Sequence, residues 1–158
     1  MEKKPIATTL SIEEMMPAVC EALSEGYSVE LSLSGSSMLP LVREGRDTVI
    51  LTRLTRPIRK YDVVLYRRQD SSYVLHRAVH IGGETFSAVG DNQLIVERGI
   101  PHSAVIAKLD FVRREGKLID PNSFMRRRCA ELRNFTRPMR HFLVRVKRKL
   151  KRMFAKRR

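Results

Sequence analysis

From residue 28 to residue 112 the chain is a series of short segments in which apolar and polar residues alternate, with turn residues between them. Alternation with a period of two places the apolar side chains on one face of a β-strand. Clusters of Gly, Asp, Asn and Ser between the segments favour tight turns. The predicted strands cover residues 28–34, 48–54, 62–66, 73–81, 85–89 and 104–112. No helical pattern separates them, which predicts a mainly β fold, either a small antiparallel sheet or a partly closed barrel.

A helix is predicted before the first strand. Ser11 and Glu14 form a capping box, and apolar residues follow at helical spacing as far as Ser24. The predicted organisation is an N-terminal helical segment (1–27), a β-rich domain (28–120) and a C-terminal tail (121–158).

The charge is concentrated in the tail. The whole chain carries a net charge of +14, and residues 121–158 hold 15 Lys and Arg side chains and one acid, Glu131. The remaining 120 residues are therefore neutral overall. A neutral body argues against a folded surface built for nucleic acid, whereas a basic tail indicates attachment to anionic lipid or polyphosphate.

Within residues 138–154 the apolar residues recur at helical spacing among Lys and Arg, which predicts a basic amphipathic helix. Such a helix is typical of a segment that lies on an anionic membrane surface. Two alternatives remain. The apolar stripe packs on the body with its charges solvated, or the tail binds nucleic acid, which is the less favoured of the two.

The two cysteines, Cys20 and Cys129, are too far apart in sequence to indicate a disulfide framework or a metal site. No run of apolar residues reaches the roughly 18–20 needed to cross a bilayer, and the start of the chain lacks a secretory signal. We expect a cytoplasmic protein, or one peripheral on the cytosolic face of a membrane, with no cofactor and no metal.

Three residues are candidates for chemistry. Ser37 lies in the turn Ser34–Pro40 that follows a strand, where a hydroxyl is exposed and backbone N–H groups can face an oxyanion. His76 lies inside an apolar strand, and Asp91 follows Gly90 in a turn. Each also has a structural interpretation, as a solvated turn, a buried structural histidine and a turn residue.

The order of four motifs resembles signal peptidase I. Gly35-x-Ser37-Met38-x-Pro40 is similar to the nucleophile motif of that family, and residues 62–66 to the strand that comes next. Residues 74–77 resemble the strand that carries the base, and residues 90–92 the loop that closes the site. The resemblance implies a serine endopeptidase that cleaves a peptide or protein substrate, with residues 28–120 as the peptidase domain.

The family's bacterial members and its self-cleaving repressor relatives place a lysine where this chain has His76. The histidine resembles the endoplasmic-reticulum-type branch. The resemblance therefore implies that Ser37 is the nucleophile and His76 the general base. Asp91 is the first choice for the acid that orients the imidazole, and Glu97 the second. The Ser37 amide, with that of Ser36, would hold the oxyanion, and Gly35 and Met38 complete this loop.

The chain departs from the family pattern in two turns, at Gly45-Arg46-Asp47 and at Tyr61, where the family usually has Gly-Asp and Gly. The predicted helix also stands in the place of the family's transmembrane anchor, which leaves the substrate open. Two rival functions follow. One is a catalytically silent, peptidase-like binding module held at a membrane or nucleic acid by its tail, and the other is a self-cleaving regulator of the repressor type.

Overall fold

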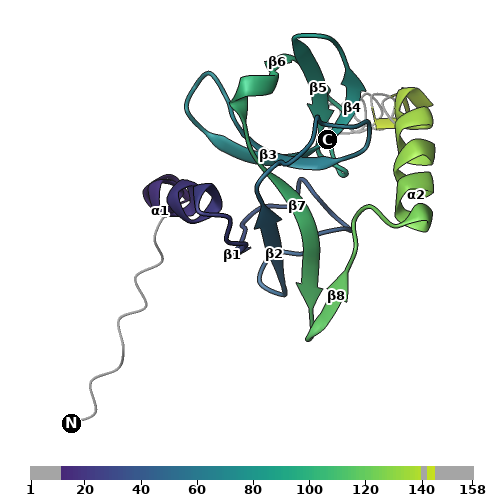
Figure 1. Cartoon of the computed structure of the whole chain (residues 1–158). Helices are drawn as coiled ribbons and strands as arrows, with labels where there is room; N and C mark the ends of the chain where they lie inside the picture. The colour runs from purple at the N-terminus through teal and green to yellow at the C-terminus, as the bar shows by residue number, and fades with distance from the viewer. Residues whose placement is uncertain (1–11, 140–141, 145–158) are drawn as a thin grey trace, which may run out of the picture.

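The computed structural model describes residues 12–139 and 142–144. Within these residues the chain is mainly β, with eight antiparallel strands in one sheet and three helical segments (Figure 1). The predicted antiparallel β class is thus confirmed. The sheet is open, because its path through the described residues ends at β1 on one side and at β6 on the other.

In chain order the elements are α1 (Ile12–Ser24), β1 (Val29–Ser32), β2 (Asp47–Thr52), β3 (Val63–Arg67), β4 (Tyr73–Ile81), β5 (Thr85–Val89), β6 (Glu97–Pro101), the 3₁₀ helix η1 (His102–Ala104), β7 (Val105–Arg114), β8 (Lys117–Ile119) and α2 (Phe124–Phe135). The predicted N-terminal helix is present, although its capping residue Ser11 lies outside the described residues. The helix predicted over 138–154 lies mostly outside them as well.

The strand order in the sheet is β1-β2-β7-β3-β4-β5-β6, and β8 pairs with β7. The central strand β3 is buried on both faces because two hydrophobic clusters pack against it. Val63 and Leu65 belong to the first cluster, and Val64 and Tyr66 to the second. This division follows directly from the alternation of side chains along a strand.

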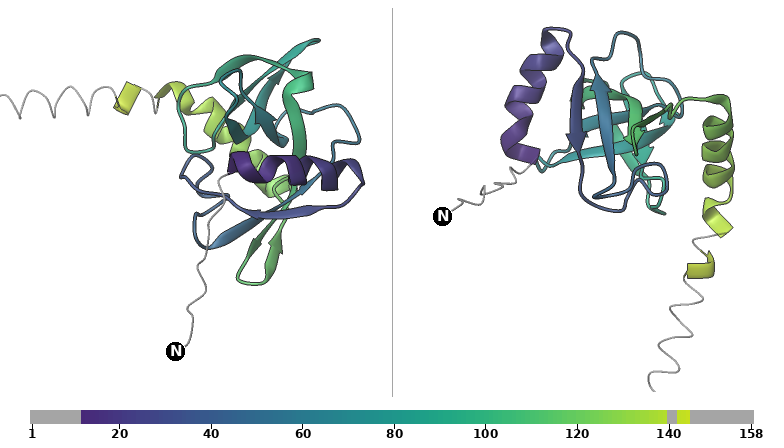
Figure 2. Two further views of the ribbon diagram at one scale, coloured as in Figure 1. Left: turned by 90° about the vertical axis from the view of Figure 1, so that its left-hand side faces the viewer. Right: turned by 90° about the horizontal axis from the view of Figure 1, so that it is seen from below.

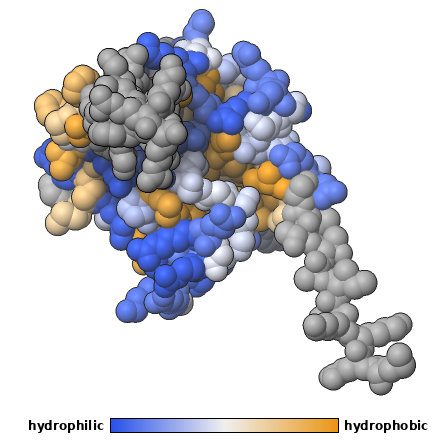
Figure 3. Space-filling model, turned by 180° about the vertical axis from the view of Figure 1, so that it is seen from behind, coloured by the Kyte–Doolittle hydropathy of each residue, from blue (hydrophilic) through white to orange (hydrophobic). Residues whose placement is uncertain are grey.

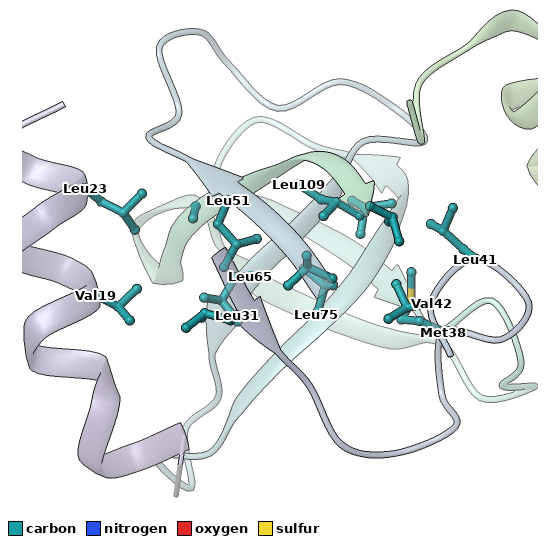
Figure 4. Packing of buried hydrophobic residues seen from close by; sticks show 14 of the residues in the cluster. Val19, Leu23, Leu31, Met38, Leu41, Val42, Leu51, Leu65, Leu75 and Leu109 are labelled. Atoms are coloured by element: carbon teal, nitrogen blue, oxygen red, sulfur yellow. The ribbon is translucent and has the colours of Figure 1, made fainter. Parts of the chain in front are cut away.

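The first cluster joins α1, the sheet and the segment after β1. Val19 and Leu23 of α1 point toward the sheet, and Met38 and Val42 pack from the other end (Figure 4). Leu51 lies between them with none of its surface exposed. Burial of such a side chain contributes about 1.5–3 kcal/mol, so this cluster fixes the segment that carries Ser37 to the body.

Two strands were not predicted. β6 contains Gly99 and Pro101, which read as turn residues, but β6 is an end strand, where a missing N–H is tolerated. β8 is short and pairs with β7 across the two-residue turn Glu115-Gly116. Both turn residues have positive φ (50° and 76°), as in a type I′ hairpin turn.

The helix α2 lies on the opposite side of the body from α1 (Figure 2). It packs through Ala130, which is 6% exposed, and through Arg127, which pairs with the buried carboxylate of Asp62 at 3.3 Å. Contacts therefore cross the boundary predicted at residue 120. In the described part of the chain, no helix is long and apolar enough to span a membrane.

Candidate active site

Ser37 is held in a short turn between β1 and the buried residues that follow it. Gly35 has φ of 99°, a left-handed conformation that glycine adopts without strain. Met38 is buried in the first cluster while Ser37 itself is half-buried. The core thus anchors the turn on one side of Ser37 and leaves the serine itself partly exposed.

The loop Gly90-Asp91-Asn92 docks directly on this turn. The Asn92 amide donates to the Ser37 carbonyl at 2.8 Å, and the Asn92 side-chain amide donates to the Ser36 carbonyl at 3.2 Å. A Cβ at Gly90 would lie 2.6 Å from the Ser37 carbonyl oxygen and 3.1 Å from the Ser37 Cβ. Only glycine allows the two segments to approach this closely.

The same approach brings Ser37 close to His76. β4 and β5 pair with Arg77 opposite Val89, and continuing this register places Gly90 opposite His76. The turn that carries Ser37 therefore lies near the His76 end of the β4–β5 pairing. Among the described residues no hydrogen bond joins the side chains of Ser37 and His76.

His76 is 1% exposed, and its polar side-chain contacts are made by Nδ1. The Tyr66 hydroxyl lies 3.2 Å from Nδ1, and Glu97 Oε1 lies 3.3 Å from it. Tyr66 also donates to Glu97 Oε2 at 2.8 Å, which uses its only proton. Both neighbours of Nδ1 are therefore acceptors, so Nδ1 carries the proton and Nε2 keeps its lone pair. No other residue in the described ranges forms a hydrogen bond with Nε2.

Arg68 completes this network. Its guanidinium binds both carboxylate oxygens of Glu97, with Nε 2.9 Å from Oε2 and Nη2 in contact with Oε1. A bidentate pair of this kind fixes the carboxylate in one orientation. Glu97 in turn belongs to β6 and lies opposite Ala88 of β5, so that β4 and β5 stand between its strand and β3, which carries Tyr66.

The environment sets the charge of each group. Burial lowers the pKa of His76 below its usual value, with the Glu97 charge opposing this shift. Burial would raise the pKa of Glu97, but the hydrogen bonds from Arg68 and Tyr66 outweigh it and hold that pKa low. Burial and the Glu97 carboxylate raise the pKa of Tyr66. Near neutral pH the site therefore contains a neutral imidazole, an ionised carboxylate and a neutral phenol.

Of the two candidate acids, Glu97 lies beside His76 and Asp91 pairs with Arg77. Asp91 forms a bidentate pair with Arg77, at 2.8 Å from Nε and 2.9 Å from Nη2, and has no hydrogen bond to His76. The reason is geometric, since Arg77 follows His76 directly in β4 and successive side chains point to opposite faces. Arg77 is 3% exposed and also donates to the Tyr61 carbonyl at 2.9 Å. Asp91 is thus the counter-charge of a buried arginine.

The turns at Gly45-Arg46-Asp47 and at Tyr61 both contain a residue with left-handed backbone geometry. Gly45 has φ of 70°, and Tyr61 has φ of 74°, a left-handed conformation that is uncommon for a bulky side chain. Tyr61 precedes Asp62 and β3 and accepts the Arg77 hydrogen bond through its carbonyl. The turn is therefore structural, and it fixes Arg77.

A groove of about 620 Å³ runs along Ser37. The first turn of α1, including Glu13 and Glu14, the end of β1 with the residues after it, and the first residues of β4 line the groove. β5 pairs with β4 only from Arg77 onward, so residues 73–75 have no strand on that side within the described residues. The side chains that line the groove are mostly apolar and include Leu31, Leu33, Met38, Leu65, Tyr73 and Leu75.

The backbone near Ser37 offers donors for an oxyanion. In the described part of the chain, neither the Ser36 amide nor the Ser37 amide donates a hydrogen bond to another residue. The described residues contain no group of three or more His, Cys, Asp or Glu side chains placed to hold a metal ion.

Two members of the site, Tyr66 and Arg68, were not among the sequence candidates. Tyr66 lies in an apolar strand and reads as a core residue, and Arg68 reads as a solvated strand end. The available signal was register. Pairing of 63–67 with 73–77 places Val64 opposite His76, and Tyr66 lies two residues beyond Val64 on the same face of the sheet.

Comparison with protein-family models, curated proteins and solved structures finds no match to this chain.

Proposed function

We propose that this chain is a serine endopeptidase of the signal-peptidase type, with Ser37 as nucleophile and His76 as general base. The observation that carries the proposal is the state of His76. Its Nδ1 is held by Tyr66 and Glu97, which leaves the lone pair on Nε2, and the loop that follows β5 brings the Ser37 turn near the same end of β4. A serine hydroxyl needs such a base, and the base needs a third group to orient it.

The proposed reaction has two stages. In the first, Nε2 of His76 takes the Ser37 hydroxyl proton while Oγ attacks the carbonyl carbon of the peptide bond. The carbonyl oxygen becomes an oxyanion, which the Ser36 and Ser37 amides stabilise. The intermediate collapses as His76 gives its proton to the leaving amine, which leaves an acyl-serine. In the second stage, His76 takes a proton from the water that attacks the acyl carbon; the bond from this carbon to Oγ then breaks, His76 returns the proton to Oγ, and the carboxylic acid product leaves.

Glu97 has the role that the sequence assigned first to Asp91. Its carboxylate keeps the proton on Nδ1 and stabilises the imidazolium that forms during each proton transfer. Arg68 and Tyr66 prevent this carboxylate from turning away. Separation between Ser37 and His76 in the unliganded chain is compatible with catalysis, since such hydrogen bonds often tighten only when substrate binds.

The groove favours an extended peptide as substrate. The end of β1 and the free edge of residues 73–75 offer backbone groups that an extended chain can pair with, as in β-strand addition. The apolar lining indicates that the substrate side chains nearest to the cleaved bond are apolar.

A silent binding module is the second candidate, and the absence of a Ser37–His76 hydrogen bond among the described residues favours it. A fluorophosphonate probe separates the two functions, because it labels only an activated serine. We expect labelling of the intact chain at Ser37, none in Ser37→Ala, and labelling slowed on the order of 10³-fold in His76→Ala; turnover of a peptide substrate should fall on the order of 10³-fold in both variants. The double variant should be little worse than either single variant.

Ser36→Ala is the matched control, since it removes a neighbouring hydroxyl but keeps the Ser36 backbone amide. It should retain labelling. An intact chain that no fluorophosphonate labels between roughly pH 5 and pH 9, a range that spans the titration of a histidine base, would favour the silent module. Labelling accompanied by cleavage of the chain itself, at a rate independent of its concentration, would favour the self-cleaving regulator.

A further inference from the structure

The helix α2 packs on the body with its polar side. Arg127 donates to the Lys60 carbonyl and to Asp62 Oδ1, each at 3.3 Å, and Arg133 donates to the Leu39 carbonyl at 3.3 Å. A surface helix of a globular protein normally does the reverse, with its apolar stripe on the core and its charges in water. The apolar side chain of α2 that is buried against the body is the small one of Ala130.

The opposite side of α2 and the residues after it carry large apolar side chains that are exposed. We name this set the outer stripe, and its members are Met125 (71% exposed), Leu132 (63%), Phe135 (83%), Met139 (58%), Phe142 (65%) and Leu143 (56%). Within α2, spacings of seven and three residues place Met125, Leu132 and Phe135 on one side of the helix, and Met139, Phe142 and Leu143 are exposed in the described residues that follow it. In Figure 3 hydrophobic atoms appear along the edge of the molecule on the side of α2, next to strongly hydrophilic ones.

An exposed apolar surface of this size marks an interaction site. The described part of the predicted tail stripe, Met139, Phe142 and Leu143, does not pack on the body. Residues 121–158 contain 15 basic side chains and one acidic side chain. The same segment of a second copy of the chain would therefore be repelled by charge. The phosphates of a nucleic acid would bind the basic residues, but they would not bind the exposed Phe, Leu and Met side chains.

We propose that the outer stripe lies in the interface of an anionic lipid bilayer, to which the net positive charge of residues 121–158 attracts it. An amphipathic helix rich in Arg and Lys binds in this way, by apolar burial together with attraction to anionic lipid. The body then lies on the water side of α2. It is held there by the contacts of Arg127 with Asp62 and of Arg133 with Leu39.

The binding is independent of the proposed peptidase reaction, because none of the stripe residues contacts Ser37, His76 or Glu97. The two are nevertheless linked in space. Arg133 of α2 binds the carbonyl of Leu39, two residues after Ser37. A membrane-bound α2 therefore sets the nucleophile turn at a fixed distance from the bilayer.

Flotation of the full chain with vesicles tests the proposal. We expect binding to phosphatidylglycerol–phosphatidylcholine vesicles that is at least ten-fold stronger than binding to phosphatidylcholine alone. The Leu132→Ser/Phe135→Ser/Met139→Ser variant should lose at least ten-fold of the binding to the anionic vesicles. The matched control, Tyr27→Ser/Leu118→Ser, removes two apolar side chains that are similarly exposed elsewhere and should bind as the unchanged protein does.

Fluorescence provides a second readout that does not depend on a loss of binding. The chain has no Trp, so Phe135→Trp introduces a single fluorophore into the outer stripe. Its emission should shift to shorter wavelength with anionic vesicles, while Tyr27→Trp should show no shift. Undiminished binding of the triple-serine variant, an unshifted emission of the Phe135→Trp variant, or binding to duplex DNA alone would overturn the proposal.

Discussion

The hydroxyl of Tyr66 donates its only proton to Oε2 of Glu97 across 2.8 Å. Because this proton is committed to the carboxylate, the phenol oxygen can only accept from the neighbouring His76 Nδ1, 3.2 Å away. One hydrogen bond between a tyrosine and a glutamate thus selects the imidazole tautomer that acts as a base through Nε2. The arrangement makes Tyr66 a positioning residue for His76.

Replacing Tyr66 by Phe should lower kcat about ten-fold, or roughly 1.4 kcal/mol of barrier, and leave KM nearly unchanged. The ring keeps its edge contact with Phe86 at 5.8 Å, so the lost hydroxyl should cost only about 1 kcal/mol of stability. Kinetics on a peptide substrate and ¹⁵N chemical shifts of His76 are the measurements. Tyr27→Phe is the exposed control. A Tyr66→Phe variant with unchanged kcat and an unchanged tautomer would contradict the role.

Glu97→Gln should lower kcat by about 10²–10⁴-fold with little change in fold, because an amide cannot stabilise the imidazolium that forms in the transition state. Circular dichroism and thermal denaturation of the same samples control for folding. If kcat survives in this variant, the acid that orients His76 is not Glu97.

Asp91→Ala should act on stability. Its removal leaves the guanidinium of Arg77, which is 3% exposed, without a counter-charge. Loss of one partner of a buried ion pair costs roughly 3–5 kcal/mol, measured as a lower urea midpoint at unchanged slope. Glu97→Gln is the matched comparison, because it should lower kcat and leave the stability nearly unchanged. A variant of Asp91 that is fully stable but inactive would restore the assignment made from the sequence.

The pH dependence should follow a histidine whose pKa is lowered by burial. Since the base must be neutral, activity should rise with a midpoint below the usual value of about 6.5 and then level off. The same shift affects folding. The unfolded chain binds a proton at His76 more readily than the folded chain, so the stability should be complete above about pH 6.5 and fall as the pH drops toward the folded pKa. Acid loss of stability should be smaller in His76→Gln.

Gly90→Ala should displace the turn that carries Ser37, because the new Cβ would lie 2.6 Å from the Ser37 carbonyl oxygen. Overpacking against backbone costs typically about 1–3 kcal/mol, and we expect fluorophosphonate labelling to slow at least ten-fold. Gly83→Ala is the matched control, since a Cβ there meets nothing within 4 Å. Equal behaviour of the two variants would mean that the loop and the turn are not in tight contact.

The sequence by itself determined the elements that depend on local pattern. The alternation of apolar residues predicted the bounds of β4 and β5 as the structure has them, and it located Ser37 after β1 and His76 within β4. These features are local, because the direction of a side chain along a strand depends only on the period of two. The glycine-containing turns were also predicted, because the preference for a turn depends on the residues of the turn itself.

Only the tertiary structure decided which acid meets His76. Asp91 and Glu97 are close together in the sequence, and no local rule separates them. Glu97 reaches the site because β6, a strand with Gly99 and Pro101 that reads as a loop, pairs with β5. Asp91 is drawn to Arg77 on the other face of β4. Both outcomes depend on which distant strands pair and in which register, and that choice is made by burial of the whole sheet rather than by any one segment.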